Sequence, residues 1–533
     1  MSRERQLIDF LSQKKSYPYK ADYIKIIQTH ISIIAVAPPF VYKFKKGINF
    51  GFIDYSTFEK RRENVFKEFT LNKRLCENIY EEIVKVYFQD SVLSFEKGDL
   101  FEYGIKMKYL KTENCLQEIT RSGNLSLVHI KLLAKTLKEF YVKLNPEYSG
   151  FGSPDVVKSA VLGNFEVVEK LLDKGDAFKT DFIKKYSTAF LETHKEYIQN
   201  RVKQGWVRDC HGDLRLEHIY FQTNSEKKSV CIYDCIEFND HFRFIDIAND
   251  LAFLSMDFDY NQKPTESNLL MQMVLEQELD KSLMELFWFF KCYRAYVRVK
   301  VNMLRACEDE VPEKERASSA RDAKRYLALS LRYALLPLKP VVIQVMGKVG
   351  TGKTTVARYI ADAFDIPHLN SDYIRKTMVN LDPYKPSEKA KRKELYSTEF
   401  TQKTYSKLFL ESLKVLKQGL PVVIDATFSK KEIRNHFRDE FDKEGFACIT
   451  IETTASRNVI NGRLKSRVDE KNNTSDATMT EKEFMDASYE SPKELTGLHY
   501  KLLDTSPSET SVWQRELFEY LSEIHRQNYL DIG

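Results

Sequence analysis

Residues 347 to 354 read Gly-Lys-Val-Gly-Thr-Gly-Lys-Thr, a complete G-x-x-x-x-G-K-[ST] spacing of glycines, a lysine and a hydroxyl. Glycines let the main chain fold tightly, so that amide groups and the positive end of a following helix face an anion. Lys353 would reach the outer phosphates of ATP, and the Thr354 hydroxyl would bind Mg²⁺. The residues predicted to hold the nucleotide are Gly347, Lys348, Val349, Gly350, Thr351, Gly352, Lys353, Thr354 and Thr355.

The segments around this loop have the form that such a site needs. The apolar run from Val341 to Met346 predicts a buried strand, and Thr354 to Phe364 predicts a helix. A glycine-containing turn could match the spacing by chance. Strand, loop and helix in register favour the nucleotide site over that alternative.

A second set of chemically capable residues lies earlier in the chain, with His211-Gly212-Asp213 about twenty residues before Asp234. Phosphoryl transfer needs a carboxylate to orient the acceptor hydroxyl and take its proton, and oxygen ligands for Mg²⁺. Taken alone, His-Gly-Asp could be a tight turn with a helix-capping aspartate. Asp234, in an apolar strand context, shifts the interpretation toward a kinase-like site.

The stretch Cys-His-Gly-Asp-Leu-Arg-Leu-Glu-His, followed by Ile-Tyr-Asp at 232–234, resembles the aminoglycoside phosphotransferase family, the small-molecule relatives of protein kinases. The resemblance covers roughly residues 20 to 305. It implies that Asp213 is the base and Asp234 the principal metal ligand. It also implies that Lys43 contacts phosphate and that Glu68 is its ion-pair partner.

The same resemblance assigns the adenine-binding hinge to residues 102–107 and mostly structural roles to the acids of residues 244–253. The chain departs from the family pattern where His218 replaces the metal-binding asparagine, because Mg²⁺ prefers oxygen ligands. Glu217 or Glu237 could supply the missing oxygen. Residues 29–39 also lack the glycines of a phosphate-covering loop. A pseudokinase that keeps the fold without catalysis is the alternative.

Two segments after the phosphate loop could complete its site. The apolar strand Pro421 to Thr427 contains Asp425, placed as a Mg²⁺ ligand requires, and Asp372 and Arg375 follow an earlier strand. The domain resembles P-loop kinases of the AAA_33 and zeta-toxin type over about 340–505. The resemblance implies that Asp372 and Arg375 align the acceptor, although Asp372 could equally cap a helix.

Arg463 and Arg467 resemble the arginines of a lid helix that close on the phosphates and stabilise charge in the transition state. Their i, i+4 spacing would also suit an ordinary solvated helix face. The segment follows the strand of Asp425 along the chain. This position makes a lid helix as well supported as a solvated helix face.

These residues need two scaffolds. We predict an aminoglycoside-phosphotransferase-like kinase domain over residues 1–337, bilobal and α+β, and a P-loop domain over 338–533 with a mainly parallel sheet covered by helices. Pro337 and Pro340 end the last helix of the first part, which begins near Glu313.

Bulk properties limit the partners. With a net charge of +5 over 533 residues, the chain is not expected to bind nucleic acid, and the basic run 389–393 is expected to be a solvated helix face. Its eight cysteines lack CxxC pairs and are expected to be reduced, as in a cytoplasmic protein. No run of 18 apolar residues predicts a membrane segment.

The leading hypothesis is an ATP- and Mg²⁺-dependent phosphotransferase with two nucleotide-binding domains and a hydroxyl-bearing small-molecule acceptor. The second is a nucleotide switch or sensor with a catalytically inactive first domain, for which His218 is the reason. The third is a polynucleotide-kinase-like activity of the P-loop domain. No residue identifies the acceptor, because one fold hosts many substrates.

Overall fold

The structure is a computed structural model, and it describes residues 2–49, 51, 53–172, 174–224, 227–275, 281–309, 311–335, 340–466 and 486–530. The chain divides into two compact units: unit 1 comprises 1–157 and 196–280, and unit 2 comprises 158–195 and 281–533. The boundary predicted at 338 falls among residues 336–339, outside the described residues, and stays a prediction.

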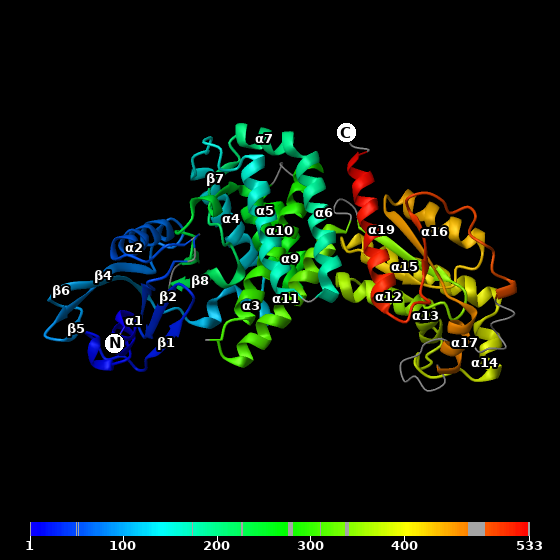
Figure 1. Cartoon of the computed structure of the whole chain (residues 1–533), viewed down its shortest axis with the longest axis horizontal. Coiled ribbons are helices and arrows are strands. Elements are labelled where there is room, and N and C mark those ends of the chain that lie inside the picture. Colours follow the sequence, from blue (N-terminus) through cyan, green and yellow to red (C-terminus); the bar gives the residue numbers. More distant parts are fainter. Residues whose placement is uncertain are drawn as a thin grey trace. The chain divides into compact units, whose positions relative to one another are not determined.

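Unit 1 begins with an antiparallel sheet of six strands in the order β1-β2-β3-β6-β4-β5 (Figure 1). The strands and the helices around them are α1 (Arg3–Leu11), β1 (Lys25–Gln28), β2 (Ser32–Ala37), β3 (Phe40–Lys45), α2 (Phe58–Lys73), β4 (Tyr80–Gln89), β5 (Val92–Ser94) and β6 (Asp99–Lys108). Strand β3 carries Lys43 and helix α2 carries Glu68.

The rest of unit 1 is mostly helical, with two short antiparallel pairs of strands, and the His-Gly-Asp loop follows the first strand of one pair. Its elements are α3 (Leu116–Arg121), α4 (Leu127–Lys143), α7 (Lys195–Lys203), β7 (Val207–Asp209), β8 (Ile219–Asn224), β9 (Lys227–Ile232), β10 (Phe244–Asp246), α8 (Ile247–Tyr260) and α9 (Pro264–Leu275). Strand β7 pairs with β10, and β8 pairs with β9. A sheet followed by a helical part agrees with the expected bilobal, kinase-like α+β fold.

Unit 2 is built on a sheet of five parallel strands in the order β12-β13-β11-β14-β15. The elements are β11 (Val341–Gly347), α12 (Lys353–Phe364), β12 (His368–Asn370), α13 (Ser371–Thr377), α14 (Lys389–Leu395), α15 (Thr398–Lys417), β13 (Val422–Asp425), α16 (Lys431–Lys443), β14 (Ala447–Thr454), α17 (Arg457–Ser466), β15 (Tyr500–Asp504) and α19 (Thr510–Leu530). The described strands confirm the predicted parallel sheet.

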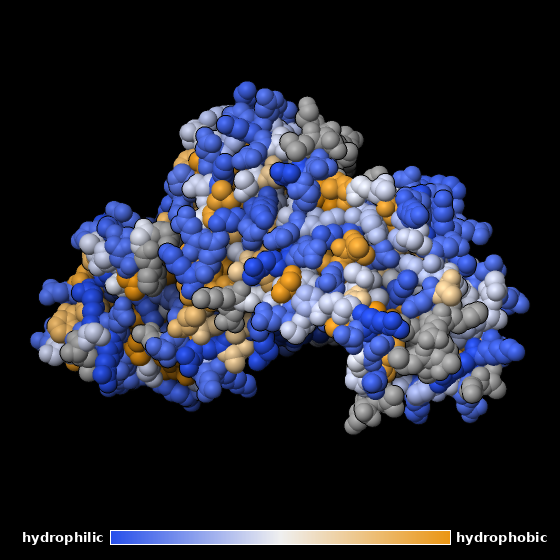
Figure 2. All heavy atoms as spheres, turned by 45° about the vertical axis from the view of Figure 1, so that its right-hand side comes forward, coloured by the Kyte–Doolittle hydropathy of each residue, from blue (hydrophilic) through white to orange (hydrophobic). Residues whose placement is uncertain are grey.

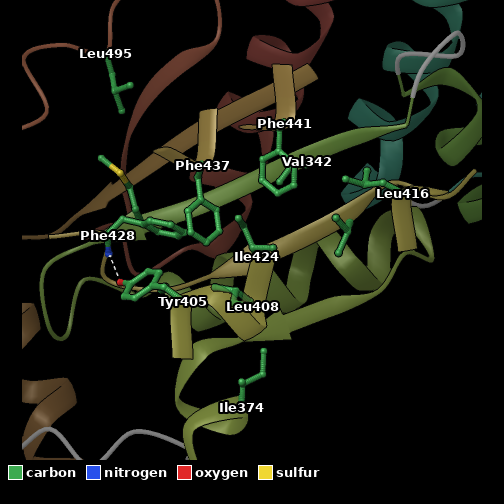
Figure 3. Close-up of a cluster of buried hydrophobic side chains, with 13 residues drawn as sticks. Val342, Ile374, Tyr405, Leu408, Leu416, Ile424, Phe428, Phe437, Phe441 and Leu495 are labelled. Atoms are coloured by element: carbon green, nitrogen blue, oxygen red, sulfur yellow. Dashed lines mark hydrogen bonds between the residues drawn. The ribbon is translucent and has the colours of Figure 1, made fainter. Parts of the chain in front are cut away.

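One face of this sheet is held to α15 and α16 by a hydrophobic core (Figure 3). Val342 and Ile424 of the central strands meet Leu408 of α15 and Phe437 of α16 there. Strand β11 is buried at every position, which is typical of a central parallel strand with helices on both faces. The core therefore fixes the carboxyl ends of β11 and β13, where the phosphate loop and Asp425 begin.

Four helices earlier in the chain belong to the same unit as the P-loop sheet: α5 (Pro154–Leu171), α6 (Ala177–Thr193), α10 (Lys281–Ala306) and α11 (Glu313–Ala334). The start expected near Glu313 is confirmed for α11. Phe518 of α19 packs against Phe182 of α6 and stacks on Phe364 of α12, with ring centroids 5.5 and 5.4 Å apart. Helix α6 is therefore part of the core beneath the nucleotide-binding helix.

The expectation of reduced thiols is wrong for one pair. Cys76 and Cys231 form a disulfide, with Cα atoms 4.6 Å apart, because the segment after α2 lies beside β9. Their separation of 155 residues hid this pairing from the sequence. Cys235, by contrast, is a buried free thiol.

Hydrophilic residues cover most of the face seen in Figure 2, and hydrophobic residues appear there in small groups. Among the described residues, no helix is long and apolar enough to cross a membrane.

Candidate functional site

The phosphate loop leaves the carboxyl end of β11 and enters α12, as the spacing predicts. Its three glycines all have left-handed backbone angles, with φ of 139° at Gly347, 83° at Gly350 and 90° at Gly352. A Cβ atom at Gly347 would lie 2.5 Å from the carbonyl oxygen of Thr453 on β14. Other residues would be strained at these positions, so the glycines determine the shape of the loop.

The lysine of the motif folds back over this loop. Lys353 Nζ donates to the carbonyl of Lys348 at 2.9 Å, and the Thr351 hydroxyl donates to the same carbonyl at 2.8 Å. The Thr351 hydroxyl also lies 2.7 Å from that of Thr453. These bonds order the loop and keep the Lys353 ammonium at its mouth, where the phosphates of a nucleotide are expected.

Asp425, at the end of β13, is buried beside the loop with a defined hydrogen-bond partner. Asn370 Nδ2 donates to Asp425 Oδ2 at 2.7 Å, and His368 Nε2 lies 3.5 Å from the same oxygen. Burial raises the pKa of Asp425, but hydrogen bonds from His368 and Thr354 and the charge of Lys353 outweigh burial and lower it. The carboxylate is therefore ionised, as a metal ligand must be. Neither His368 nor Asn370 was expected at this site.

The predicted acceptor residues meet on α13. Arg375 Nη1 donates to Asp372 Oδ1 at 2.6 Å, and the Tyr396 hydroxyl donates to the same oxygen at 3.2 Å. The helix is capped by Asn370, whose side chain accepts from Tyr373 N. Asp372 is therefore not the cap, and the helix-capping alternative is wrong for this residue. Its Oδ2 remains suited to accept a hydrogen bond from a substrate hydroxyl.

One cavity of 1440 Å³ in unit 2 joins these groups. Its lining includes the predicted residues Val349, Gly350, Lys353, Thr354, Asp372, Arg375 and Asp425. Residues from the loop, from β13 and from α13 thus face a single space, although Lys353 and Asp372 are 19 positions apart and Asp372 and Asp425 are 53 positions apart in the sequence. The cavity is large enough for a nucleotide tail and a small acceptor.

Of the two arginines predicted on a lid helix, Arg463 and Arg467, the described residues include only Arg463. Arg463 lies on α17 and donates to the hydroxyl of Thr505 at 2.8 Å and to its carbonyl at 2.6 Å. Its Nη1 is 3.5 Å from the carbonyl of Gly350, so the guanidinium adjoins the phosphate loop. Arg467 lies outside the described residues.

In unit 1, the predicted lysine and glutamate form an ion pair. Lys43 Nζ lies 2.8 Å from Glu68 Oε1 and 2.6 Å from Asp234 Oδ1. Burial lowers the pKa of Lys43, but the charges of Asp234 and Glu68 reverse this and raise it well above its ordinary value. Lys45, which no motif indicated, also binds Glu68 at 2.5 Å and forms a second ion pair with Glu237.

Glu237 is therefore engaged, since it also accepts the Tyr55 hydroxyl at 2.7 Å. It is buried by Lys45 and Tyr55, which gives it a structural role in place of the metal contact considered from the sequence.

Asp213, the predicted base, is held by a neighbouring arginine. Arg215 Nε donates to Asp213 Oδ1 at 2.8 Å and Nη2 donates to Oδ2 at 3.0 Å, a bidentate pair. Arg215 also pairs with Glu217. Burial lowers the pKa of Arg215, but Asp213 and Glu217 outweigh burial and raise it well above its ordinary value. The motif treats the position of Arg215 as variable, so the motif alone does not predict this pair.

His218 has a fixed ring orientation in the place of the family's asparagine. Its Nδ1 donates to the carbonyl of Asp213 at 2.8 Å, which turns Nε2 toward Asp234 Oδ2 at 3.7 Å. Arg215 Nη2 lies 3.5 Å from the same Nε2. A guanidinium cation therefore lies beside the atom that would have to bind a metal.

Asp250 of α8 holds the His-Gly-Asp loop through hydrogen bonds to its main chain. The main-chain amides of His211 and Gly212 donate to its two carboxylate oxygens at 3.1 and 2.9 Å, and Tyr141 donates to Oδ2 at 2.9 Å. Burial lowers the pKa of His211 to about 4, so its ring is neutral. The structural role expected for the acids of residues 244–253 agrees with these contacts.

The hinge predicted at residues 102–107 is wrong. These residues lie within β6, whose main chain pairs with β3 on one side and β4 on the other. Glu102 is buried and accepts from Arg61 Nε at 2.8 Å. Residues 104–107 pair on both sides, and Glu102 and Tyr103 pair with β4, so an adenine cannot use the main-chain groups that these pairings occupy.

The two units differ in how well they suit Mg²⁺. In unit 2, the Thr354 hydroxyl and the ionised Asp425 supply hard oxygen donors beside the phosphate loop, which fits Mg²⁺ bound together with phosphates. In unit 1, Asp234 already pairs with Lys43, and the second ligand would be an imidazole next to Arg215. That set does not fit the expected magnesium pair. Among the described residues, no group of three or more His, Cys, Asp or Glu could hold a metal alone.

Residues 342–492 match the model of the AAA_33 family, described as an AAA domain, which confirms the resemblance seen in the C-terminal part. The uncharacterized protein Rv2004c of Mycobacterium tuberculosis is 24% identical over 461 residues, 86% of this chain and 88% of the relative. The long alignment shows that the relative shares sequence with both parts of this chain.

Similar solved structures include a choline/ethanolamine kinase family protein from Mesorhizobium loti, with 12% identity, 61% of this chain and 99% of that chain covered, and a TM-score of 0.35. A gluconokinase from Sinorhizobium meliloti 1021 has 18% identity, covers 36% of this chain and 98% of its own, and has a TM-score of 0.28. These scores carry no argument about substrate. The matched AAA domain contains the phosphate loop and Asp425.

Proposed function

We propose that this protein is an ATP-dependent phosphotransferase whose reaction takes place in unit 2. The observation that carries the proposal is the single cavity that contains the phosphate loop, Asp425 and the Asp372–Arg375 pair. A phosphate-binding loop and a separate acid-and-arginine pair in one space are the two halves that a transfer between ATP and a hydroxyl requires.

The cavity residues have two roles: one set binds the nucleotide and the other positions the acceptor. Lys353 and the loop amides bind the outer phosphates, and Thr354 with Asp425 would hold Mg²⁺, which neutralises phosphate charge when bound with the nucleotide. Asp372 Oδ2 orients the acceptor hydroxyl and accepts its proton. Arg375 keeps the Asp372 carboxylate in place through the contact at 2.6 Å. Positioning and charge neutralisation supply most of the acceleration, because the transition state is loose.

Nucleotide binding by the full chain tests the first half of this proposal. The full chain is preferable to a fragment from 338 onward, because α6 and α11 belong to the core of unit 2. Lys353→Ala should weaken binding of a non-hydrolysable ATP analogue, measured by calorimetry in a Lys43→Ala background that removes a unit 1 contribution. Lys443→Ala, an exposed lysine paired with Glu440 on α16, is the matched control. Equal affinities in Lys353→Ala and the control would overturn the assignment.

A second candidate function concerns unit 1, which we propose is a nucleotide or ligand sensor without catalysis. The Arg215–Asp213 pair favours it, because a base whose two oxygens both accept hydrogen bonds from an arginine is poorly placed to accept a substrate proton. ADP production by the full chain discriminates the two. A rate that survives Asp213→Ala and fails in Asp425→Asn supports the sensor, and a rate lost in Asp213→Ala contradicts it.

A further inference from the structure

The cavity of unit 2 extends beyond the phosphate loop to a basic helix that the proposed reaction does not use. Helix α14 carries the run Lys-Ala-Lys-Arg-Lys at residues 389–393, which was expected to be a solvated helix face. Arg392 and Lys393 instead line the same cavity as Lys353 and Asp372. Two cations of the run therefore face the space in which the acceptor would bind.

A tyrosine connects these cations to the acceptor residues. Tyr396 follows Arg392 by one helical turn, and its main-chain amide donates to the Arg392 carbonyl at 2.9 Å. Side chains four positions apart lie on one face of a helix. The Tyr396 ring lies 4.3 Å from the Arg375 guanidinium and its hydroxyl donates to Asp372. Arg392 is thus next to the group that covers Arg375.

Arg375 has a donor that the protein does not satisfy. The residue is 6% exposed, and its Nε has no hydrogen-bond partner among the described residues, although its Nη1 engages Asp372. Burial lowers the pKa of Arg375, but the charge of Asp372 outweighs burial and the pKa is raised, so the group is a cation. Arg375 also lines the cavity, so a ligand anion bound there would lie beside a guanidinium cation that Asp372 contacts only at Nη1.

We propose that the acceptor is a small hydroxyl compound that carries an anionic group, a phosphate or a carboxylate, bound by Arg375, Arg392 and Lys393. This inference rests on the proposed phosphotransferase function and adds the chemical class of its substrate. Guanidinium and ammonium groups bind both anions through charge-assisted hydrogen bonds. A cationic acceptor, such as an amino sugar or a quaternary amine, would face three like charges at this end of the cavity.

Binding of inorganic phosphate and of acetate tests the anion site without knowledge of the substrate. The full chain is first saturated with Mg²⁺ and a non-hydrolysable ATP analogue, so that the phosphate loop is filled, and each anion is titrated by calorimetry at constant ionic strength. Arg392→Gln and Lys393→Gln should each weaken binding about tenfold, the equivalent of one charge-assisted hydrogen bond. Lys407→Gln on α15, which pairs with Glu411, is the control and should leave the affinity unchanged.

The two α14 variants keep the test independent of folding, because Arg392 is half-buried and Lys393 is exposed, whereas Arg375 is buried. Anion affinities that neither α14 variant changes would overturn the inference, as would a failure of both anions to bind. Neither result would contradict the proposed function, because nucleotide binding is measured separately with Lys353→Ala. A preference for phosphate over acetate identifies the anion as a phosphate, and the reverse identifies a carboxylate.

Three compounds with one carbon skeleton test the substrate class directly: glycerol, glycerate and glycerol 3-phosphate. All carry hydroxyls, and two add an anionic group. As competitors for anion binding, glycerate or glycerol 3-phosphate should bind at least tenfold more tightly than glycerol, and the difference should disappear in Arg392→Gln. Equal affinities for all three compounds would contradict the proposal.

Discussion

The two sites hold similar numbers of charged groups but arrange them in opposite ways. In unit 1, each acid of the kinase-like site already has a cation: Lys43 holds Asp234, Lys45 holds Glu237, and Arg215 holds Asp213. In unit 2, the cavity between Lys353 and Asp425 is open to a ligand. The first site is neutralised by its own side chains, whereas Lys353 and Asp425 of the second line one cavity.

This contrast shows why a motif alone does not determine activity. Asp213 and Asp234 occupy the expected positions, yet the residues between the motif letters supply their partners. Arg215 occupies both oxygens of Asp213, so this pair must be broken before the carboxylate can act on a substrate, and breaking a partly buried pair costs free energy. Arg375, by contrast, pairs with only one oxygen of Asp372. Unit 1 therefore keeps the residue types of phosphotransfer without the open geometry that unit 2 has.

The largest expected effect is on the rate of ADP production, and it should differ between variants of Asp425 in unit 2 and of Asp213 in unit 1. Asp425→Asn should lower ADP production by the full chain about 10²- to 10³-fold, because a charged group aimed at the phosphates is lost while the shape is kept. Asp213→Ala should change the rate less than twofold. A coupled assay of ADP release measures both. If the two variants lose activity equally, unit 1 is catalytic and the contrast drawn above is wrong.

The second effect is a pH dependence of stability, and each unit has one buried histidine that should cause it. Burial lowers the pKa of His211 in unit 1 to about 4 and that of His525 in unit 2 to about 3. Both rings are neutral in the folded state, and an unfolded histidine has a pKa of about 6.5. Between these values the unfolded chain binds more protons, so stability falls as the pH is lowered from about 6.5 toward 4. The loss is on the order of 3 kcal/mol for each group.

Urea titrations at pH 7, 6 and 5, followed by hydrogen exchange of peptides 207–214 and 519–527, report each unit separately. His211→Gln should flatten the pH dependence of the first peptide and leave that of the second. An unchanged slope for peptide 207–214 in this variant would show that His211 is not the group responsible.

The sequence was sufficient where function depends on local main-chain geometry. The phosphate loop, its strand and its helix were predicted within a residue or two, because glycine spacing and apolar runs are local properties. Asp250 has the structural contacts expected for the acids of residues 244–253, and the metal-binding role of Asp425 stays a prediction. The hinge was misplaced because residues 102–107 lie in strand β6, and the pairing of β6 with β3 and β4 is visible only in the folded sheet.

Long-range contacts account for the other gaps. Asn370 and His368 reach Asp425 from 55 or more positions away, and the Cys76–Cys231 bond spans 155 residues. The partnership of Lys45 with Glu237 spans 192 positions. Nothing in the spacing of a single sequence specifies such pairs.

A smaller effect is expected from the glycines of unit 2. Gly347→Ala places a Cβ atom 2.5 Å from the carbonyl of Thr453 at a φ of 139°, so the variant should lose about 1–3 kcal/mol of stability and bind ATP analogues weakly. Gly163→Ala is the matched control, because it lies in α5 with nothing within 4 Å and should stabilise the helix by roughly 0.5–1 kcal/mol. Thermal melting and nucleotide titration measure both. Tight nucleotide binding by Gly347→Ala would show that the loop need not hold its strained shape.

The smallest effect concerns Asn370, which joins local structure to chemistry in unit 2 because it caps α13 and also donates to Asp425. Asn370→Ala should lose about 1 kcal/mol of stability with the cap and lower the rate about tenfold with the bond. Asn370→Asp separates the two roles: it keeps a capping oxygen and replaces the donor with a second negative charge beside a buried carboxylate. Its stability loss should be smaller and its rate loss larger than those of Asn370→Ala. If both variants lose rate in proportion to stability, Asn370 acts only as a cap, and Asp425 is positioned by other contacts.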